Sequence, residues 1–345
     1  MGDGEGEKVI IRIMKVSINL VTWNGKKYLP HCLDAIAKQT FRDFSLFILD
    51  NGSTDGTVEY LKNSLLPVAN CRVEFNEENV GFASGHNQAL KSTESDYVLM
   101  LNQDIILEPS FLEVVVKFLD AHPEVGAVTG KLLRWDFPNN QKTDKIDSAG
   151  IKIFKSHRAV ELGAGETDGE KWNTAGEVFG VSGAAPTYRR AALNEAVIDG
   201  EYFDEDFFSY KEDLDLAYRL RLLGSRAWFL PEARGYHDRT ARGNGEKDVD
   251  AALGRKNKSA FVNYHSYKNH LFFLWKNVPA GVWFRYGHRI KWYEFKKLIY
   301  LLLFEIRTLG SIGEFFKKLP KMRKKRKWIM AHRKISMEEI KKWFS

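Results

Sequence analysis

The sequence has few cysteines and no long hydrophobic run, and each shortage excludes a class of protein. Two cysteines among 345 residues, Cys32 and Cys71, cannot build a disulfide framework or a cysteine-based zinc or iron–sulfur site, and they suit a reducing compartment. The longest uncharged apolar run of the C-terminal region, Leu298–Phe304, is far shorter than the roughly 20 residues that span a bilayer. The polar, acidic start is unlike a signal peptide, and we expect residues 1–14 to form a flexible extension.

Two signatures of phosphate binding are also missing. No G-x-G-x-x-G follows the first predicted strand, and no G-x-x-x-x-G-K-[ST] occurs. The first strand ends instead in Thr22-Trp23-Asn24-Gly25. This argues against dinucleotide oxidoreductases and P-loop enzymes. It also argues against nucleotidyltransferases, which need a glycine-rich loop with arginine and lysine at this place.

The charge is distributed unevenly. The net charge is +7, with 44% hydrophobic and 28% charged residues, which is ordinary for a globular protein. Residues 265–345 hold 20 Lys and Arg against five Asp and Glu, a local charge of +15, and five of the nine tryptophans. The sequence therefore predicts a mildly acidic body at 15–264 and a basic, aromatic helical region at 265–345.

Strand and helix patterns alternate along the body, which predicts an α/β fold with a mostly parallel sheet. The expected strands are 16–22, 44–49, 73–75, 97–101, 125–133 and 227–230, the last closed by Pro231. The expected helices are 28–39, 57–66, 109–121 and 213–223, and a glycine-bearing loop at 79–86 should lead into a helix ending at Leu90. Residues 136–178 are interpreted as a lid or hairpin, with turns at 147–150 and 163–166.

Polar residues follow two of these strands, at the sheet edge where ligands of parallel sheets bind. Asp50 can either accept hydrogen bonds from a base or ribose or cap the next helix, and the cluster alone does not decide. Asp104 is placed where a divalent cation would join protein and diphosphate, although a single Asp more often caps a turn.

Further along the chain, Glu212 and Asp213 open a predicted helix. They are either a favourable helix start or a general base with a neighbour that shapes the acceptor pocket. His237 follows the last strand, and it becomes a ligand candidate only if Asp104 marks a metal.

Taken together, these segments resemble the family 2 inverting glycosyltransferases of GT-A fold, and particularly their rhamnosyltransferase-like branch. The resemblance covers about residues 16–240. The motifs that carry it, in order, are VSINLVTWNG (16–25), LDNGSTDGT (49–57), ENVGFASGHNQAL (78–90), LNQD (101–104), SGAAPTYRR (182–190) and FDEDFFSYKEDLDLAYRLRLLG (203–224).

The resemblance implies a nucleotide-sugar pocket divided between two walls. Thr22 and Asn24 would lie near the nucleotide, and Asp50 would recognise the base, with Asn51 beside it. The remaining residues assigned to the nucleotide sugar are Asn79, Gly81, Phe82, Asn87, Asn102 and Gly183. The halves of the domain would be 15–133 for the nucleotide sugar and 134–264 for the acceptor.

The resemblance also implies a metal and a base. Asp104 matches the last Asp of the family's D-x-D motif, whose first position is the neutral Asn102 here, so metal affinity should be weaker. His237 resembles the late histidine that completes the site for Mn²⁺ or Mg²⁺. Asp213 matches the catalytic base, with Glu212 in the acceptor pocket. The expected reaction inverts the anomeric centre without a covalent enzyme intermediate.

The implied donor is a nucleotide-diphosphate sugar, with dTDP-rhamnose favoured and UDP-hexoses next. The implied acceptor is a hydroxyl of a glycan or a polyprenyl-linked sugar in cell-surface polysaccharide synthesis. The alternative is a non-catalytic sugar- or membrane-binding module on the same fold. That alternative predicts loss of Asp104 or Asp213, and both are present.

The C-terminal region allows three interpretations. Aromatic residues interleaved with Lys and Arg, and the basic run 321–327, are typical of helices on an anionic membrane. The less favoured alternatives are a helical subdomain packed on the body with a charged tail and, third, a segment that binds nucleic acid. We expect a cytoplasmic protein, peripheral on the membrane, and assign no oligomeric state.

Overall fold

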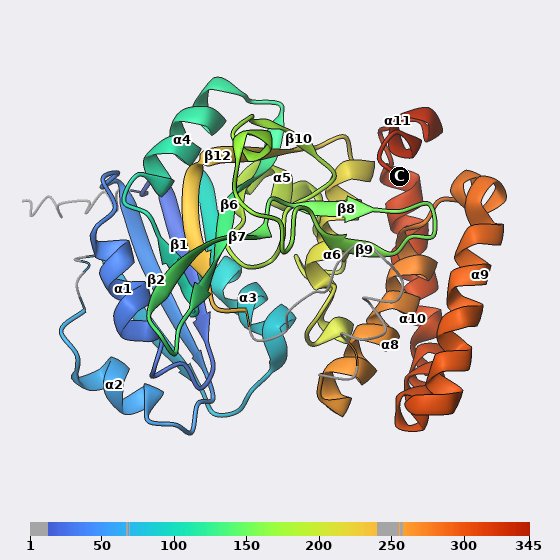
Figure 1. Cartoon of the computed structure of the whole chain (residues 1–345), viewed down its shortest axis with the longest axis horizontal. Helices are drawn as coiled ribbons and strands as arrows, with labels where there is room; N and C mark the ends of the chain where they lie inside the picture. The colour runs from blue at the N-terminus through green and yellow to red at the C-terminus, as the bar shows by residue number, and fades with distance from the viewer. Residues whose placement is uncertain (1–12, 67, 69, 240–254, 256–257) are drawn as a thin grey trace, which may run out of the picture.

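The computed structural model describes residues 13–66, 68, 70–239, 255 and 258–345. Most of the expected extension at 1–14 lies outside the described residues. A ten-stranded mixed sheet forms the body, and a column of helices stands beside it (Figure 1). The main strand order is β10-β12-β6-β11-β4-β1-β2-β3, and β5 and β7 pair with β12 and β6 respectively.

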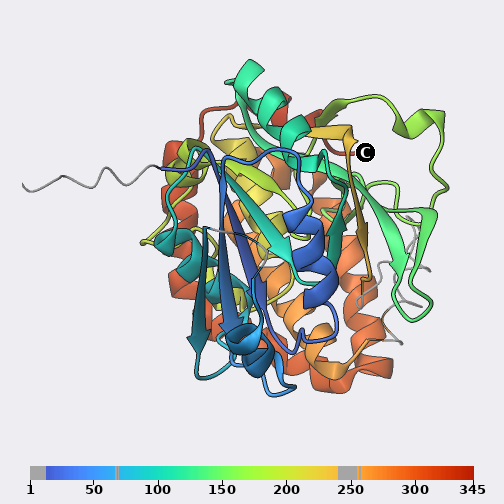
Figure 2. The same ribbon diagram turned by 90° about the vertical axis from the view of Figure 1, so that its left-hand side faces the viewer.

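The first half of the sheet is parallel, because each strand is followed by a helix that returns the chain to the same edge. Strands β1, β2 and β4 are almost fully buried, whereas the edge strand β3 is partly exposed, and β2 and α1 are conspicuous when the molecule is seen from the sheet side (Figure 2). The elements are β1 (Val16–Thr22), α1 (Leu29–Ala37), β2 (Phe44–Asn51), α2 (Thr57–Asn63), β3 (Cys71–Asn76), α3 (Gly81–Ser92) and β4 (Tyr97–Asn102).

The second half of the sheet mixes directions. Strand β12 runs parallel to β6, whereas β11 is antiparallel to both β4 and β6. The elements are β5 (Ile105–Leu107), α4 (Phe111–Ala121), β6 (Val125–Asp136), β7 (Gln141–Ser148), β8 (Ile151–Ile153), β9 (Ala159–Glu161), η1 (Glu170–Trp172), β10 (Gly176–Val178), β11 (Thr187–Arg189), α5 (Arg190–Glu195), η2 (Glu205–Phe207), α6 (Glu212–Leu222) and β12 (Arg226–His237).

The expected excursion at 136–178 consists of hairpins. Strands β6 and β7 form one, and β8 and β9 form a separate two-stranded sheet. The chain turns at 162–165, as expected for the Gly163–Glu166 segment. The expected turn at 147–150 is wrong in its first half, because Asp147 and Ser148 lie in β7, where Ser148 pairs with Leu132 of β6; the chain bends at Ala149 and Gly150.

Two other expectations are wrong in their boundaries. The helix expected after a loop at 79–86 already begins at Gly81, whose positive φ of 87° allows the chain to turn directly into α3. Pro231 does not close the last strand: β12 continues to His237 across a register shift between Leu230 and Arg234. Such an irregularity accommodates proline in a strand, since proline cannot donate a ladder hydrogen bond.

The C-terminal helices pack on the body through a shared apolar core. Phe272 and Phe273 of α8 are fully buried and belong to the same cluster as Leu214 and Tyr218 of α6. The helices are α8 (Ala260–Asn277), α9 (Ala280–Phe304), η3 (Ile306–Leu309), α10 (Gly310–His332) and α11 (Met337–Lys341). Helix α9 lies at the outer edge of the molecule, with α8 and α10 toward the sheet (Figure 1). None of the helices among the described residues has the length and hydropathy needed to cross a bilayer.

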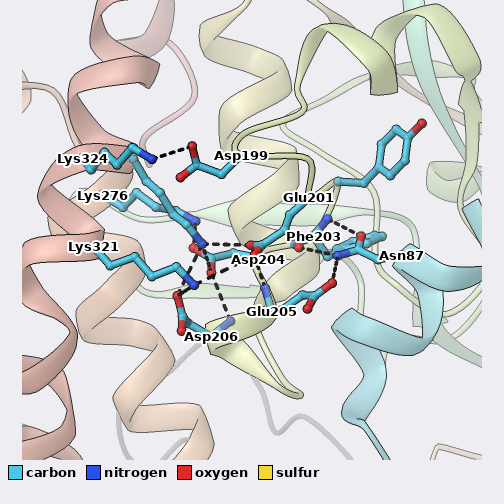
Figure 3. A network of polar contacts seen from close by, with 12 residues as sticks. Asn87, Asp199, Glu201, Phe203, Asp204, Glu205, Asp206, Lys276, Lys321 and Lys324 are labelled. Carbon is cyan, nitrogen blue, oxygen red and sulfur yellow. Dashed lines mark hydrogen bonds and ion pairs between the residues drawn. The ribbon is translucent and has the colours of Figure 1, made fainter. Parts of the chain in front are cut away.

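The basic run at 321–327 is not a free polybasic patch. Lys325 is buried, and its Nζ lies 2.5 Å from Asp204 Oδ1 and 3.0 Å from Glu201 Oε2. The neighbouring pairs are Lys276 with Asp204, Lys321 with Asp206 and Lys324 with Asp199 (Figure 3). Much of the positive charge of α10 is therefore matched by the acidic segment 199–206 of the body.

Candidate active site

The ends of three parallel strands meet at one edge of the sheet. Thr22 at the end of β1 lies opposite Asp50 of β2, and Val21 lies opposite Asn102 of β4. Strand register alone therefore brings together Thr22, Asp50 and Asn102, which the sequence assigns to the nucleotide.

A glutamine side chain joins the loops that follow β1 and β4. Gln103 Oε1 accepts hydrogen bonds from the Thr22 hydroxyl and from the Trp23 N–H, the latter at 3.0 Å. Its Nε2 donates to the Trp23 carbonyl at 3.1 Å. A Cβ on Gly25 would stand 2.2 Å from Gln103 Oε1, so a larger residue here would displace the Gln103 side chain. Gln103 was not singled out from the sequence.

The β1 and β2 loops are joined in the same way. Asn24 has a positive φ of 49°, and its N–H donates to Ser53 Oγ at 2.8 Å while its Oδ1 accepts the Thr54 N–H at 2.8 Å. Asp50 is fully buried, and its Oδ1 accepts the Ser53 N–H at 3.0 Å. Asp50 Oδ2 has no hydrogen-bond partner among the described residues. One oxygen of the Asp50 carboxylate thus stabilises the turn, and the other has no hydrogen bond among the described residues.

Asn51 and Asn79 hold the start of α3. Asn51 Nδ2 donates to Asn79 Oδ1 and to the Gly81 carbonyl, both at 3.2 Å, and Asn79 Oδ1 accepts the Gly81 N–H at 2.8 Å. A Cβ on Gly81 would meet the Phe208 ring at 2.6 Å, so the segment after Phe207 packs directly on this helix start. Phe82 extends the contact, because its N–H donates to Ser209 Oγ at 3.3 Å.

Asn87 lies on α3 but faces the acidic segment. It is buried, donates to the Phe203 carbonyl at 2.8 Å and to Glu205 Oε1 at 2.9 Å, and accepts the Phe203 N–H at 2.9 Å (Figure 3). The structure therefore does not bring Asn87 into the group formed by Asp50, Asn51 and Asn79 through any hydrogen bond among the described residues. Its assignment to the nucleotide stays a prediction.

The segment between η2 and α6 has an unusual backbone that is held from α8. Its residues with positive φ are Phe208 at 65°, Tyr210 at 73° and Lys211 at 68°. Non-glycine residues in this region cost on the order of 1–3 kcal/mol each unless surrounding contacts hold them. Asn269 of α8 supplies such contacts, because its Nδ2 lies 2.7–2.9 Å from the carbonyl oxygens of Phe207, Ser209 and Tyr210.

This segment leads directly into Glu212 and Asp213, the first two residues of α6. Glu212 is buried, and burial together with the charges of Asp213 and Asp215 raises its pKa well above the ordinary value. Burial therefore favours the neutral form of Glu212. Asp213 is half-buried, and its Oδ2 accepts the Gly183 N–H at 3.0 Å while its Oδ1 accepts the Leu214 N–H at 2.7 Å. Two adjacent carboxyl groups thus have different environments.

A histidine and two aspartates form the second cluster. Strand β12 places His237 opposite Ile105, immediately beside Asp104, and His237 Nε2 lies 3.4 Å from Asp104 Oδ2. His237 Nδ1 lies 2.8 Å from Asp147 Oδ2. Burial by itself would lower the pKa of His237, but the Asp104 and Asp147 carboxylates raise it to about 9.

A chain of polar contacts connects this cluster to Asp213. Asp147 Oδ2 accepts from Arg239 Nε at 3.0 Å, and Arg239 Nη1 lies 2.8 Å from Glu161 Oε1. The Ser182 hydroxyl donates to Glu161 Oε1 at 3.0 Å, and the next residue is Gly183, whose N–H binds Asp213. Burial raises the pKa of Glu161, and the negative charges of Asp147 and Asp213 add to this rise against the effect of Arg239.

The donor set at Asp104 and His237 fits a divalent cation with few protein ligands. One carboxylate oxygen and one imidazole nitrogen face each other, and a carboxylate on the far ring nitrogen is the usual outer partner of a metal-binding histidine. Among the described residues, no group of three or more His, Cys, Asp or Glu is arranged to hold a metal ion. Phosphate oxygens would have to complete the coordination, as is common for Mg²⁺.

Sequence reasoning missed the residues that support this cluster. Asp147, Glu161 and Arg239 come from separate segments, and no local spacing connects them before the chain is folded. A weak signal existed for Arg239, which lies two residues beyond His237 at a strand end. Asp147 could not be recognised, because its sequence neighbours Ser148 and Gly150 are typical of a turn.

Two solved structures share the fold of this chain. S. aureus TarS 1–349 in complex with UDP-GlcNAc aligns with a TM-score of 0.52 and 18% identity, covering 92% of this chain and 88% of that chain. The mannosyltransferase PcManGT from Pyrobaculum calidifontis, in complex with GDP-Man and Mn²⁺, aligns with a TM-score of 0.52 and 18% identity, covering 93% and 86%. The expected GT-A type fold is confirmed.

Three curated proteins are similar in sequence. An uncharacterized glycosyltransferase of Haemophilus influenzae is 25% identical over 113 residues, which are 33% of this chain and 35% of that protein. Chondroitin synthase of Escherichia coli is 33% identical over 104 residues, 30% of this chain and 15% of that protein. An N-acetylglucosaminyl-diphospho-decaprenol L-rhamnosyltransferase of Mycobacterium tuberculosis is 24% identical over 273 residues, 70% of this chain and 81% of that protein.

The chain thus spans about a third of the Haemophilus protein and less than a fifth of the chondroitin synthase. The family model described as glycosyl transferase family 2 matches residues 17–195, which are just over half of the 345 residues. That stretch contains β1 to α5 and hence the strand ends at Thr22, Asp50 and Asp104. The chain belongs to glycosyl transferase family 2.

Proposed function

We propose that this protein is a metal-dependent inverting glycosyltransferase, which moves a sugar from a nucleotide diphosphate to an acceptor hydroxyl. One observation carries the proposal: a continuous series of polar contacts joins the metal candidate Asp104 to the base candidate Asp213, through His237, Asp147, Arg239, Glu161 and the Ser182–Gly183 backbone. A purely structural aspartate at a helix start needs no such connection to a second acidic site.

The two carboxyl groups at the start of α6 have the properties that general-base catalysis requires. Asp213 is partly exposed and held by two backbone N–H groups, so it is oriented and can accept a proton from a hydroxyl. Glu212 is buried and its raised pKa favours the neutral form, which adds no charge that would compete with Asp213. Attack then occurs on the face of the sugar opposite the leaving diphosphate, and the configuration inverts.

Asp104 and His237 would hold Mn²⁺ or Mg²⁺, which supplies Lewis-acid stabilisation of the diphosphate when bound. Asp147 fixes the imidazole through Nδ1, so that Nε2 points toward Asp104. Arg239 is bound to two carboxylates and therefore balances their charge in the ground state. These residues keep the ligand atoms in place before the donor arrives.

The nucleotide would lie over the ends of β1 and β2. The unpaired Oδ2 of Asp50 is an acceptor suited to a base N–H, and the Asn51–Asn79–Gly81 cluster forms the opposite wall. We assign Thr22, Asn24, Asn102, Phe82 and Gly183 to the surroundings of the donor. The candidates for the donor remain dTDP-rhamnose and UDP-hexoses, since the mycobacterial relative is an L-rhamnosyltransferase and the staphylococcal structure contains UDP-GlcNAc.

The acceptor is proposed to be a hydroxyl of a glycan or of a polyprenyl-linked sugar. The mycobacterial relative, of which the alignment covers 81%, is described by its name as acting on N-acetylglucosaminyl-diphospho-decaprenol, which supports a lipid-linked acceptor. The hairpins at 136–178 would border this acceptor, because Glu161 of β9 is in contact with Ser182, next to Gly183.

A ligand panel tests the proposal. The purified chain is melted with UDP, GDP and dTDP sugars, with and without Mn²⁺, and slow hydrolysis to the nucleotide diphosphate is measured. A donor at 100 times its Kd should add about 2.7 kcal/mol to the free energy of unfolding and raise the Tm by several degrees. If no nucleotide sugar raises the Tm with or without metal, the proposed pocket is wrong. If donors bind but hydrolysis and transfer are both absent in every acceptor mixture, the non-catalytic alternative is supported instead.

A further inference from the structure

The outer face of α9 carries a row of apolar side chains that the fold leaves in solvent. Their exposed fractions are 94% for Phe284, 61% for Trp292, 52% for Phe295, 42% for Ile299, 54% for Leu302 and 68% for Leu303. From Trp292 onward the successive spacings are of three or four residues, apart from the adjacent pair Leu302 and Leu303, so these side chains share one face of the helix. We call this row the α9 apolar face.

The opposite face of α9 accounts for its attachment to the body. Its buried residues are Val282, Gly287, Ile290 and Leu301, and the helix stands at the outer edge of the molecule (Figure 1). Further exposed apolar side chains are Phe304 at the end of α9, Ile306 just after it and Phe316 of α10, with exposed fractions of 66%, 70% and 63%. Soluble monomers rarely expose contiguous apolar surface of this kind without a partner.

Most of the charges around the α9 apolar face are positive. Arg285, Arg289, Lys291 and Lys296 are exposed on the same helix. The acidic residue within α9, Glu294, is half-buried and faces inward, where its Oε1 lies 2.8 Å from His270 Nε2. Near the start of the helix, a hollow of about 560 Å³ is lined by Phe284, by the cations Arg285, Lys341 and Lys342, and by the acidic Glu338, which pairs with Lys341. Exposed aromatic and aliphatic side chains bordered by cations fit a surface that is apolar inside and anionic outside.

We propose that the α9 apolar face docks on an anionic lipid bilayer, with α9 lying in the plane of the headgroup region. Such a helix inserts its apolar residues among the headgroups and acyl chains while Lys and Arg remain at the anionic surface. The proposal deepens the proposed function, because it names the surface at which a lipid-linked acceptor would be met. It also relocates the membrane contact from the basic run at 321–327, whose lysines pair with the body, to α9.

A pair of matched variants tests the docking. The double variant Phe295→Ser/Leu303→Ser removes two exposed side chains of the α9 apolar face, and Ile13→Ser/Leu65→Ser removes two that are 55% and 99% exposed elsewhere. Full-length proteins are sedimented with vesicles of phosphatidylglycerol and phosphatidylcholine, and with phosphatidylcholine alone. The α9 variant should lose roughly 10- to 100-fold in partition coefficient on anionic vesicles, since each side chain gives up part of its burial in the membrane. The control variant should bind as the wild type does.

A third variant tests the electrostatic contribution without touching the apolar row. Arg289→Gln/Lys291→Gln should lower binding to anionic vesicles about tenfold or more, and added salt should reduce wild-type binding in the same way. Nucleotide-sugar binding, followed by thermal shift, should be equal in all variants, so that a failed vesicle assay is distinguished from a failed donor site.

Three results would overturn the proposal. Wild-type protein may remain in the supernatant with anionic vesicles at low salt. The α9 variant and its control may bind vesicles equally. The third result is a wild-type dimer in solution that Phe295→Ser/Leu303→Ser converts to a monomer without any change in vesicle binding. A second copy of the chain would then cover this face.

Discussion

Replacing Gly183 by alanine tests the role of Asp213 without removing its carboxylate. A Cβ at this position would stand 3.2 Å from Asp213 Cβ and 3.4 Å from its Oδ2. The backbone of Gly183 is not in the left-handed region, so alanine can adopt it. The new methyl group must therefore displace the Asp213 side chain by a few tenths of an ångström, or weaken the 3.0 Å hydrogen bond from the Gly183 N–H.

The expected effect follows from the sensitivity of a general base to its position. A displacement of about 1 Å costs on the order of 100-fold in rate, so a few tenths of an ångström should cost roughly 3- to 10-fold in kcat. Donor affinity should change less than kcat, because Gly183 borders the donor in our assignment but the polar contacts of the nucleotide candidates Asp50 and Asn51 do not involve it. The variant should therefore separate kcat from the affinity for the nucleotide sugar.

The assay is steady-state transfer or donor hydrolysis, combined with donor titration by thermal shift. Gly313→Ala in α10 is a matched control, because no atom lies within 4 Å of its added Cβ. It should leave kcat unchanged and stabilise the protein by up to about 1 kcal/mol through helix propensity. A Gly183→Ala protein with wild-type kcat and wild-type melting would refute the reasoning, since the carboxylate next to the new methyl group would then not be the base.

Four further predictions concern single side chains. Asp213→Asn should lower the transfer rate by about 10²–10⁴ while donor binding is retained in titrations. Asp104→Ala should weaken nucleotide-diphosphate binding only in the presence of Mn²⁺, and His237→Ala should do the same more mildly; a His237 variant with unchanged metal dependence would assign that residue a structural role. Glu212→Gln should flatten the dependence of stability on pH. The unfolded chain releases the Glu212 proton above about pH 4.5, whereas burial raises the pKa of Glu212 in the folded protein, so wild-type stability falls as pH rises above this value. Urea midpoints at pH 5 and 8 compare the two proteins. Lys325→Met should cost about 3 kcal/mol in urea unfolding, because it leaves buried carboxylates short of a counter-charge, and a loss below about 1 kcal/mol would contradict this.

The parallel half of the sheet could be predicted because each of its elements is encoded locally. The run Val16–Thr22 has the apolar, β-branched character of a strand buried on both faces, and the polar residues after it mark its end. Once alternation predicts a parallel sheet, the rule that carboxyl ends share one edge brings Thr22 and Asp50 together without further information.

The support of the metal candidate could not be predicted, because it depends on tertiary placement. Asp147 reaches His237 only because β7 pairs with β6, which in turn runs beside β12. No periodicity in the sequence encodes that hairpin register. Pro231 predicts the end of a strand, although β12 continues to His237. Long-range pairing therefore outweighed a local signal that would ordinarily end a strand.

The sequence predicts the net positive charge of the C-terminal region correctly, but it does not predict which of the charged side chains are exposed. Lys and Arg counts predict a basic surface, but whether a lysine faces solvent depends on where the acidic segment folds. Asp204 and Asp206 lie far earlier in the chain, and they form ion pairs with Lys325 and Lys321 respectively. Composition cannot show such neutralisation.

The contact of Asn269 with the segment at 207–210 has a consequence for biosynthesis. The backbone that leads into Glu212 and Asp213 is held by an amide that is translated well after both residues. A nascent chain that has already completed its sheet would still lack this support until α8 leaves the ribosome and docks. Truncation before α8 should for the same reason yield a protein whose nucleotide half can form while the candidate base Asp213 is not fixed in place. The backbone before this candidate base thus waits for the last quarter of the chain.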